Sequence, residues 1–144
     1  MAAPFQVTID CTNPAALSEF WAEALGYTQE PVPSGYSTWE AFLKDQGIPL
    51  EEGTRYSAVL PPEGTGWPRV LFQRVPEPKT VKNRVHFDLP VADRGIPTDK
   101  RRALVEETIA RLTTLGAVLA GPVEEHGSYW MVMRDPEGNE FCVF

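Results

Sequence analysis

One histidine stands where its side chain could do chemistry. His86 lies in Arg84–Leu89, a segment whose apolar and polar residues alternate as in a half-buried strand. The polar face of this strand carries Arg84, His86 and Asp88. His86 has three readings: a structural histidine satisfied by its neighbours, a general acid or base, or a hydrogen-bonding anchor for a ligand. The other histidine, His126, lies in a predicted surface turn.

Three further side chains are predicted to share the polar strand faces with His86. Gln6, Gln73 and Cys142 each fall opposite the residues expected to pack under a helix. Cys142 is read either as an inert thiol or as a thiolate with His86 as the nearby cation. The sequence contains no Ser-His-Asp order, phosphate-binding loop or Cys-x-x-Cys motif.

The tryptophans divide into one core residue and three candidates for ligand contact. Trp21 recurs with Leu17 and Phe20 at helical spacing and is expected to be core. Trp39, Trp67 and Trp130 lie in an insertion, a Pro/Gly loop and the last hairpin. Flat apolar side chains near a cleft suit an aromatic ligand. The alternative is that they only pack sheet edges and loops.

The elements that must position these residues follow from periodicity and turn signals. Asn13-Pro14 predicts the start of a helix that Gly26 ends, and Gly116 ends a second helix that Thr98 or Asp99 begins. Ser37-Thr38-Trp39-Glu40 has the form of a capping box at the start of a short helix. Strands are predicted at 5–11, 27–32, 55–60, 69–75, 84–89 and 117–123, followed by a hairpin within 128–144.

This order of elements occurs twice, as strand, helix and three further strands. Leu25-Gly26 and Leu115-Gly116 close the two helices. An internal repeat of this kind predicts two βαβββ units in one α+β domain spanning 1–144. The first repeat covers 5–75 with an insertion at 33–53, which we expect to form a lid. A linker at 76–83 leads to the second repeat, 84–144.

The last hairpin adds a resemblance to a known family. Its turn, Asp135-Pro136-Glu137-Gly138-Asn139, resembles the closing turn of the vicinal-oxygen-chelate superfamily, the glyoxalase and bleomycin-resistance fold. That resemblance implies a curved, mainly antiparallel sheet around a central cleft. It also implies metal ligands at four positions, which here hold Gln6, Gln73, His86 and Cys142. Cys142 stands where the family carries a glutamate.

The four-residue set predicts that no metal is bound and that no cofactor is required. Open sites for divalent ions are built from imidazoles and carboxylates, and glutamine is a weak ligand. The resemblance further implies a homodimer, in some members with the cleft shared between subunits.

Composition excludes several other classes. The net charge of −7 and the absence of a basic face argue against nucleic acid as a partner. No apolar run is long enough to cross a bilayer, and no signal peptide is recognisable. The two cysteines, Cys11 and Cys142, give no disulfide framework. We therefore expect a cytoplasmic protein with no membrane association.

The favoured function is metal-independent binding of a small apolar or aromatic molecule, in one version carrying an anionic group. The first alternative is a lyase, isomerase or dioxygenase in which His86 serves as acid, base or metal ligand. The second is a structural or regulatory dimer. Arg74 and Arg84 would favour an anionic ligand if they reach the mouth of the cleft.

Overall fold

The computed structural model of the protein describes residues 2–93 and 95–144. The chain forms two compact units, one ending at Pro78 and the other beginning at Lys79, and each is described by itself. We call them the N-terminal unit and the C-terminal unit. Each has the element order strand, helix and three strands, which confirms the predicted α+β fold with two βαβββ repeats.

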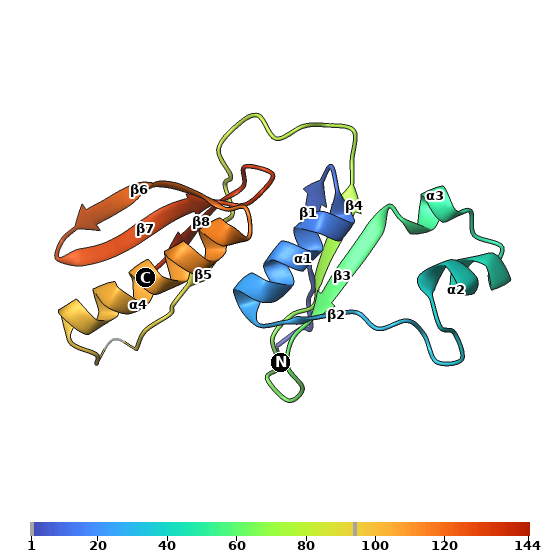
Figure 1. The fold of residues 1–144 in the computed structure, drawn as a ribbon, viewed down its shortest axis with the longest axis horizontal. Coiled ribbons are helices and arrows are strands. Elements are labelled where there is room, and N and C mark those ends of the chain that lie inside the picture. Colours follow the sequence, from blue (N-terminus) through green and yellow to red (C-terminus); the bar gives the residue numbers. More distant parts are fainter. Residues whose placement is uncertain (1, 94) are drawn as a thin grey trace. The chain divides into compact units, whose positions relative to one another are not determined.

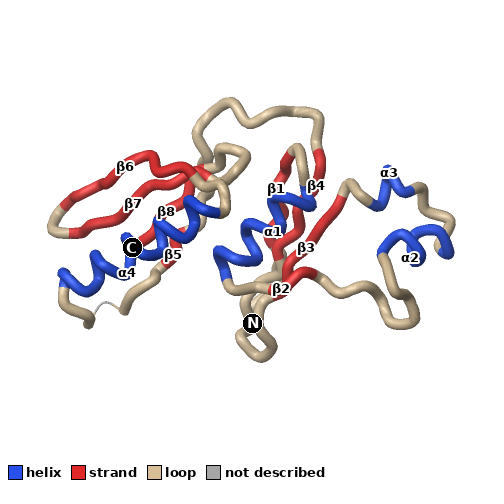
Figure 2. The backbone as a smooth tube through the Cα atoms, viewed as in Figure 1, coloured by secondary structure: helices blue, strands red, loops and turns tan. Residues whose placement is uncertain are grey.

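The N-terminal unit is a four-stranded sheet with one long helix and an insertion (Figure 1). Its strand order is β1-β4-β3-β2, with β1 parallel to β4 and the other pairs antiparallel. The insertion between β2 and β3 consists of loops and two short helices (Figure 2). The elements are β1 (Val7–Cys11), α1 (Pro14–Leu25), β2 (Thr28–Gln29), α2 (Trp39–Asp45), α3 (Leu50–Gly53), β3 (Tyr56–Leu60) and β4 (Val70–Arg74).

Helix α1 begins and ends where the sequence predicts. The Asn13 side chain accepts a hydrogen bond from the Ala16 N–H, and Pro14 occupies the first turn, where no N–H donor is needed. Gly26 ends the helix in the left-handed conformation, with φ of 67°. The apolar side of α1, including Phe20 and Trp21, is buried with Phe72 of β4. Trp21 is therefore core, as predicted.

The C-terminal unit repeats the plan. Its sheet has the order β5-β8-β7-β6, with β5 parallel to β8 and the other pairs antiparallel. Helix α4 lies along one face of this sheet and buries Val105 and Leu112 (Figure 1). The elements are β5 (Asp88–Leu89), α4 (Thr98–Thr114), β6 (Val118–Glu125), β7 (Ser128–Arg134) and β8 (Glu140–Val143).

Several predicted boundaries are wrong. Thr38, one residue after the predicted cap, caps α2 by accepting from the Ala41 N–H, and α4 follows Pro97 with no side-chain cap. The strand predicted at 84–89 is reduced to Asp88–Leu89. Among the described residues, β5 pairs with β8 alone, and Val85 is 83% exposed. His86 therefore lies in the segment leading into β5 and not in a strand.

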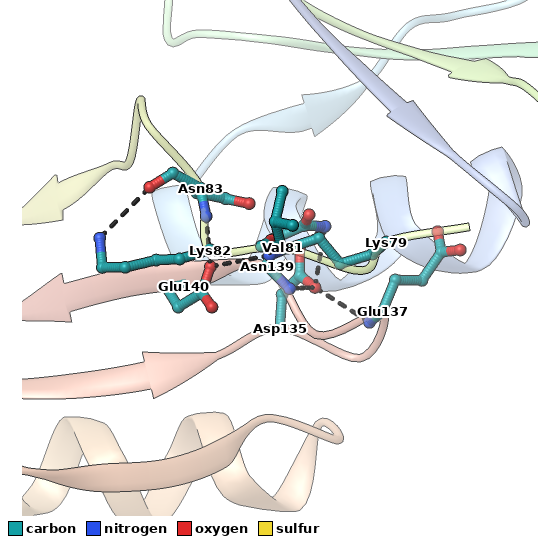
Figure 3. Close-up of polar contacts among 8 residues, drawn as sticks. All are labelled: Lys79, Val81, Lys82, Asn83, Asp135, Glu137, Asn139 and Glu140. Carbon is teal, nitrogen blue, oxygen red and sulfur yellow. Dashed lines mark hydrogen bonds and ion pairs between the residues drawn. The ribbon is translucent and has the colours of Figure 1, made fainter. Parts of the chain in front are cut away.

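The Asp135 turn is held by one buried carboxylate. Asp135 Oδ1 accepts hydrogen bonds from the backbone N–H groups of Glu137 and Asn139, both at 2.9 Å (Figure 3). The Asn139 side-chain amide donates to the same carboxylate. Gly138 adopts φ of 87°, a conformation that favours glycine. The turn residues thus close the β7–β8 hairpin in the way that their types predict.

The segment before β5 is fastened to the same hairpin. Glu140 accepts from the backbone N–H of Asn83 at 2.9 Å and pairs with the Lys79 ammonium at 3.1 Å (Figure 3). The Asn83 N–H, and then Lys79, hold the pKa of Glu140 down at about 2. These contacts fasten Lys79 and Asn83 to the C-terminal unit.

No helix among the described residues has the length and apolar character needed to cross a membrane.

Candidate functional site

The C-terminal unit contains a hollow of about 810 Å³ that includes two of the four predicted site positions. His86 and Cys142 both line it, and so does Trp130. Strand pairing explains their proximity, because Asp88 is the ladder partner of Cys142 and Val132 pairs with Cys142 from the other side. The remaining lining residues are Lys82, Asp88, Ala92, Arg101, Gly127, Ser128, Tyr129, Val132, Glu140, Phe141 and Phe144.

His86, Asp88 and Cys142 form the polar centre of this hollow. His86 Nδ1 lies 3.0 Å from Asp88 Oδ1. A carboxylate only accepts, so an Nδ1–H donated to Asp88 leaves Nε2 of a neutral imidazole as the acceptor. The side chains of His86 and Asp88 are 40% and 53% exposed. This arrangement supports both the acid/base reading and the ligand-anchor reading of His86.

Cys142 is held as a neutral thiol. Burial, followed by the charge of Asp88 and a hydrogen bond with it, raises the pKa of the Cys142 thiol. Lys82 acts in the opposite direction but is the weaker influence. A thiol with a raised pKa is a poor nucleophile at neutral pH. The hollow therefore favours the inert reading of Cys142 over the reactive one.

Asp88 belongs to the polar centre of the hollow, which the sequence did not predict. It shares a face with His86 two residues earlier, and the sequence analysis treated it only as a partner for that histidine. Donor atoms of His86, Asp88 and Cys142 all lie within 4.8 Å of one another. The missing signal was the register of β5 against β8, which sets Asp88 beside Cys142.

The other predicted positions lie in the N-terminal unit. Gln6 accepts a hydrogen bond from Arg69 at 2.8 Å, and Arg69 also pairs with Glu30 at 2.6 Å. Gln73 is half-buried on the same face of the sheet, beside Asp10 of β1. Gln73 follows the buried Phe72 and so lies on the face opposite α1, and Gln6 lies just before β1. That all four positions meet in one cleft stays a prediction.

The remaining two tryptophans have different surroundings. Trp39 lies in α2 and lines a second hollow, within the N-terminal unit. Trp67 is 57% exposed, stacks on Tyr27 with ring centroids 6.4 Å apart, and is among the lining residues of neither hollow. Of the three candidates, Trp130 lines the hollow beside His86 and Trp39 lines the other one, and contact with a ligand stays a prediction for all three.

The comparisons with known proteins define the family. A model of the glyoxalase-like domain matches residues 6–144, so the chain belongs to the glyoxalase-like domain family. This places it in the vicinal-oxygen-chelate superfamily and confirms the resemblance seen in its last hairpin. No curated protein matches the sequence closely enough to transfer a more specific identity.

Solved structures share the fold at low sequence identity. A glyoxalase/bleomycin resistance protein/dioxygenase family enzyme from Burkholderia phytofirmans is similar with a TM-score of 0.61 and 16% identity, over 96% of this chain and 94% of that one. The fosfomycin resistance protein FosX from Mesorhizobium loti is similar with a TM-score of 0.61 and 10% sequence identity, over 99% of this chain and 91% of that one. A lactoylglutathione lyase from Agrobacterium tumefaciens is similar with a TM-score of 0.55 and 15% sequence identity, over 99% of this chain and 92% of that one.

Proposed function

We propose that the protein binds a small apolar or aromatic molecule, bearing an anionic group, in the hollow of the C-terminal unit without a metal ion. The observation that supports this function is the composition of the hollow, in which Tyr129, Trp130 and Phe144 accompany His86. Its volume of about 810 Å³ lies within the range of small-molecule sites. Aromatic walls with a few polar groups are typical of such sites.

The charges in the hollow favour an anionic group on the ligand. The Glu140 carboxylate pairs with Lys79, and the Asp88 carboxylate is hydrogen-bonded to His86 and Cys142. Two cationic residues, Lys82 and Arg101, also line the hollow. The Lys82 ammonium donates to the Asn83 carbonyl oxygen at 3.2 Å. Because a carbonyl group is neutral, this hydrogen bond does not compensate the charge of Lys82. An anionic group could therefore pair with Lys82 while the apolar body of the ligand lies against Trp130.

The test uses 1-anilinonaphthalene-8-sulfonate, an aromatic sulfonate, titrated against intrinsic tryptophan fluorescence and followed by thermal shift. We expect saturable binding that Trp130→Ala weakens about tenfold or more, since buried tryptophans dominate binding energies. Lys82→Gln should weaken it about threefold and reduce its salt dependence.

Trp67→Ala is the matched control, because Trp67 is the most exposed tryptophan and lies outside the lining of the hollow. It should leave the affinity unchanged. No saturable binding to the wild-type chain, or equal losses in the two tryptophan variants, would count against this function.

One observation favours a second candidate, a metal-dependent enzyme. With Asp88 added, the hollow offers an imidazole, a carboxylate and a thiol, three donor types that Zn²⁺ accepts in proteins. His86, Asp88 and Cys142 would hold such an ion, and it would supply Lewis acidity toward a substrate oxygen. This donor set fits a metal better than the set Gln6, Gln73, His86 and Cys142 does, because it contains the Asp88 carboxylate and no glutamine.

Metal analysis separates the two candidates. Protein purified without chelator is expected to contain well under one transition-metal ion per chain, because a metal must displace the proton that Asp88 stabilises on Cys142. His86→Ala and Asp88→Asn should then leave the metal content unchanged, as should His126→Ala in the β6–β7 turn. One ion per chain that the first two variants lose and the third retains would establish the second candidate in place of the first.

A further inference from the structure

The N-terminal unit has a hollow of its own, with a volume of about 730 Å³, between the 33–53 insertion and the β3 side of the sheet. In Figure 1, α2 and α3 stand beside the exposed side of β3. Polar and charged residues, among them Glu19, Glu52 and Arg69, line the hollow together with large apolar ones. Its large apolar residues are Trp39, Leu43, Ile48 and Leu50 from the insertion and Tyr56 and Leu71 from the strands.

Several of these side chains are left open to solvent. Trp39, Ile48, Leu50 and Tyr56 are 41%, 38%, 51% and 47% exposed, although all four line one hollow. Large apolar side chains that gather in a concave region, instead of being scattered over the surface, mark a binding site. The insertion therefore does more than cover the sheet edge, because it supplies most of the apolar wall.

The polar groups of this hollow set the charge of its occupant. Glu30 is neutralised by Arg69, whose guanidinium lies 2.6 Å from its carboxylate. Glu19 and Glu52 also line the hollow, and neither forms an ion pair within the part of the chain that the structure describes. Ser18, which is fully buried, is already bonded to Ser57 at 2.7 Å. The hollow thus presents negative charge and apolar surface.

We propose that this hollow is a second ligand site, which binds a planar aromatic cation with its ring system against Trp39 and Tyr56. A cation is attracted by the carboxylates of Glu19 and Glu52 and by the face of the Trp39 ring. Arg55 already lies 5.8 Å from the centroid of the Tyr56 ring, so the ligand would stack on the opposite face of that ring. This site goes beyond the function proposed above, since it shares no residue with the His86 hollow and prefers the opposite ligand charge.

The test is the binding of proflavine, a planar aromatic cation at neutral pH, to the full chain by fluorescence anisotropy. We expect saturable binding that Trp39→Ala weakens about tenfold or more. The double variant Glu19→Gln/Glu52→Gln should weaken it about threefold to tenfold and flatten its salt dependence. Because Trp39→Ala could also disturb α2, Leu50→Ala provides a second truncation of an exposed wall residue, with an expected loss of about threefold.

The controls separate this site from the other hollow. Trp67→Ala and Trp130→Ala should leave the affinity for proflavine unchanged, and Trp39→Ala should leave that for anilinonaphthalene sulfonate unchanged. Absence of proflavine binding, or a loss with Trp130→Ala in place of Trp39→Ala, overturns the proposal whatever the fate of the first site. So does a full response to Trp39→Ala with no response to the double glutamine variant, because the charge preference would then be wrong.

Discussion

Replacing Asp135 with alanine is expected to destabilise the C-terminal unit by about 3 kcal/mol. The residue is only 2% exposed, and its carboxylate accepts from two backbone N–H groups and from the Asn139 amide. Removing it leaves these donors without their acceptor in a half-buried turn. Urea denaturation followed by circular dichroism measures the change.

Asp135→Asn is the matched control. An asparagine oxygen could still accept from the backbone N–H groups of Glu137 and Asn139, but its amide would face the donating Asn139 amide. We expect a loss of about 1 kcal/mol. If the alanine and asparagine variants are equally stable, the carboxylate does not organise the turn in the way described.

This turn also shows how far local sequence determines the fold. Asp135, Pro136 and Gly138 each suit one backbone position, so the hairpin could be predicted without knowledge of the rest of the chain. Asn13 and Gly26 did the same for α1. At these two places a side chain caps the backbone next to it, so the local sequence is sufficient to predict the structure.

The segment before β5 shows where such prediction fails. The alternation through 84–89 predicts a strand that buries Val85, but this side chain is 83% exposed. A strand needs a partner, and of residues 84–89 only Asp88 and Leu89 pair with β8. The backbone N–H of Asn83 is bonded to the Glu140 side chain instead of to a strand. Alternation describes which face could be buried, whereas pairing depends on residues more than fifty positions away.

Only part of the candidate site could be predicted from the alternation of residues along each strand. Strand parity placed Gln6, Gln73 and Cys142 on the faces away from the helices, and the sheet registers agree for Gln73 and Cys142. Parity alone could not show that Asp88 faces Cys142, nor that Arg69 holds Gln6, because both contacts depend on the alignment of different strands. The hollow beside Trp39 likewise depends on the course of the insertion, for which the sequence has no periodic signal.

The division of each sheet into a packing face and a ligand face predicts opposite results for adjacent residues. Phe72→Ala is expected to cost about 4 kcal/mol, because its fully buried ring packs beneath α1 and a cavity would remain. Gln73→Ala, one position later on the other face, should change the free energy of unfolding by no more than about 0.5 kcal/mol. Urea denaturation of the two variants, both in β4, measures the contrast.

The corresponding pair in β8 shows whether the contrast is a property of the fold. Phe141 is fully buried and Cys142 is half-buried in the hollow, so Phe141→Ala should be strongly destabilising and Cys142→Ser nearly neutral. A serine hydroxyl can also donate to Asp88 as the thiol does. If Gln73→Ala and Cys142→Ser are as costly as the phenylalanine variants, the faces assigned to ligand binding are in fact packing surfaces. The predicted sites would then lose the structural basis on which they depend.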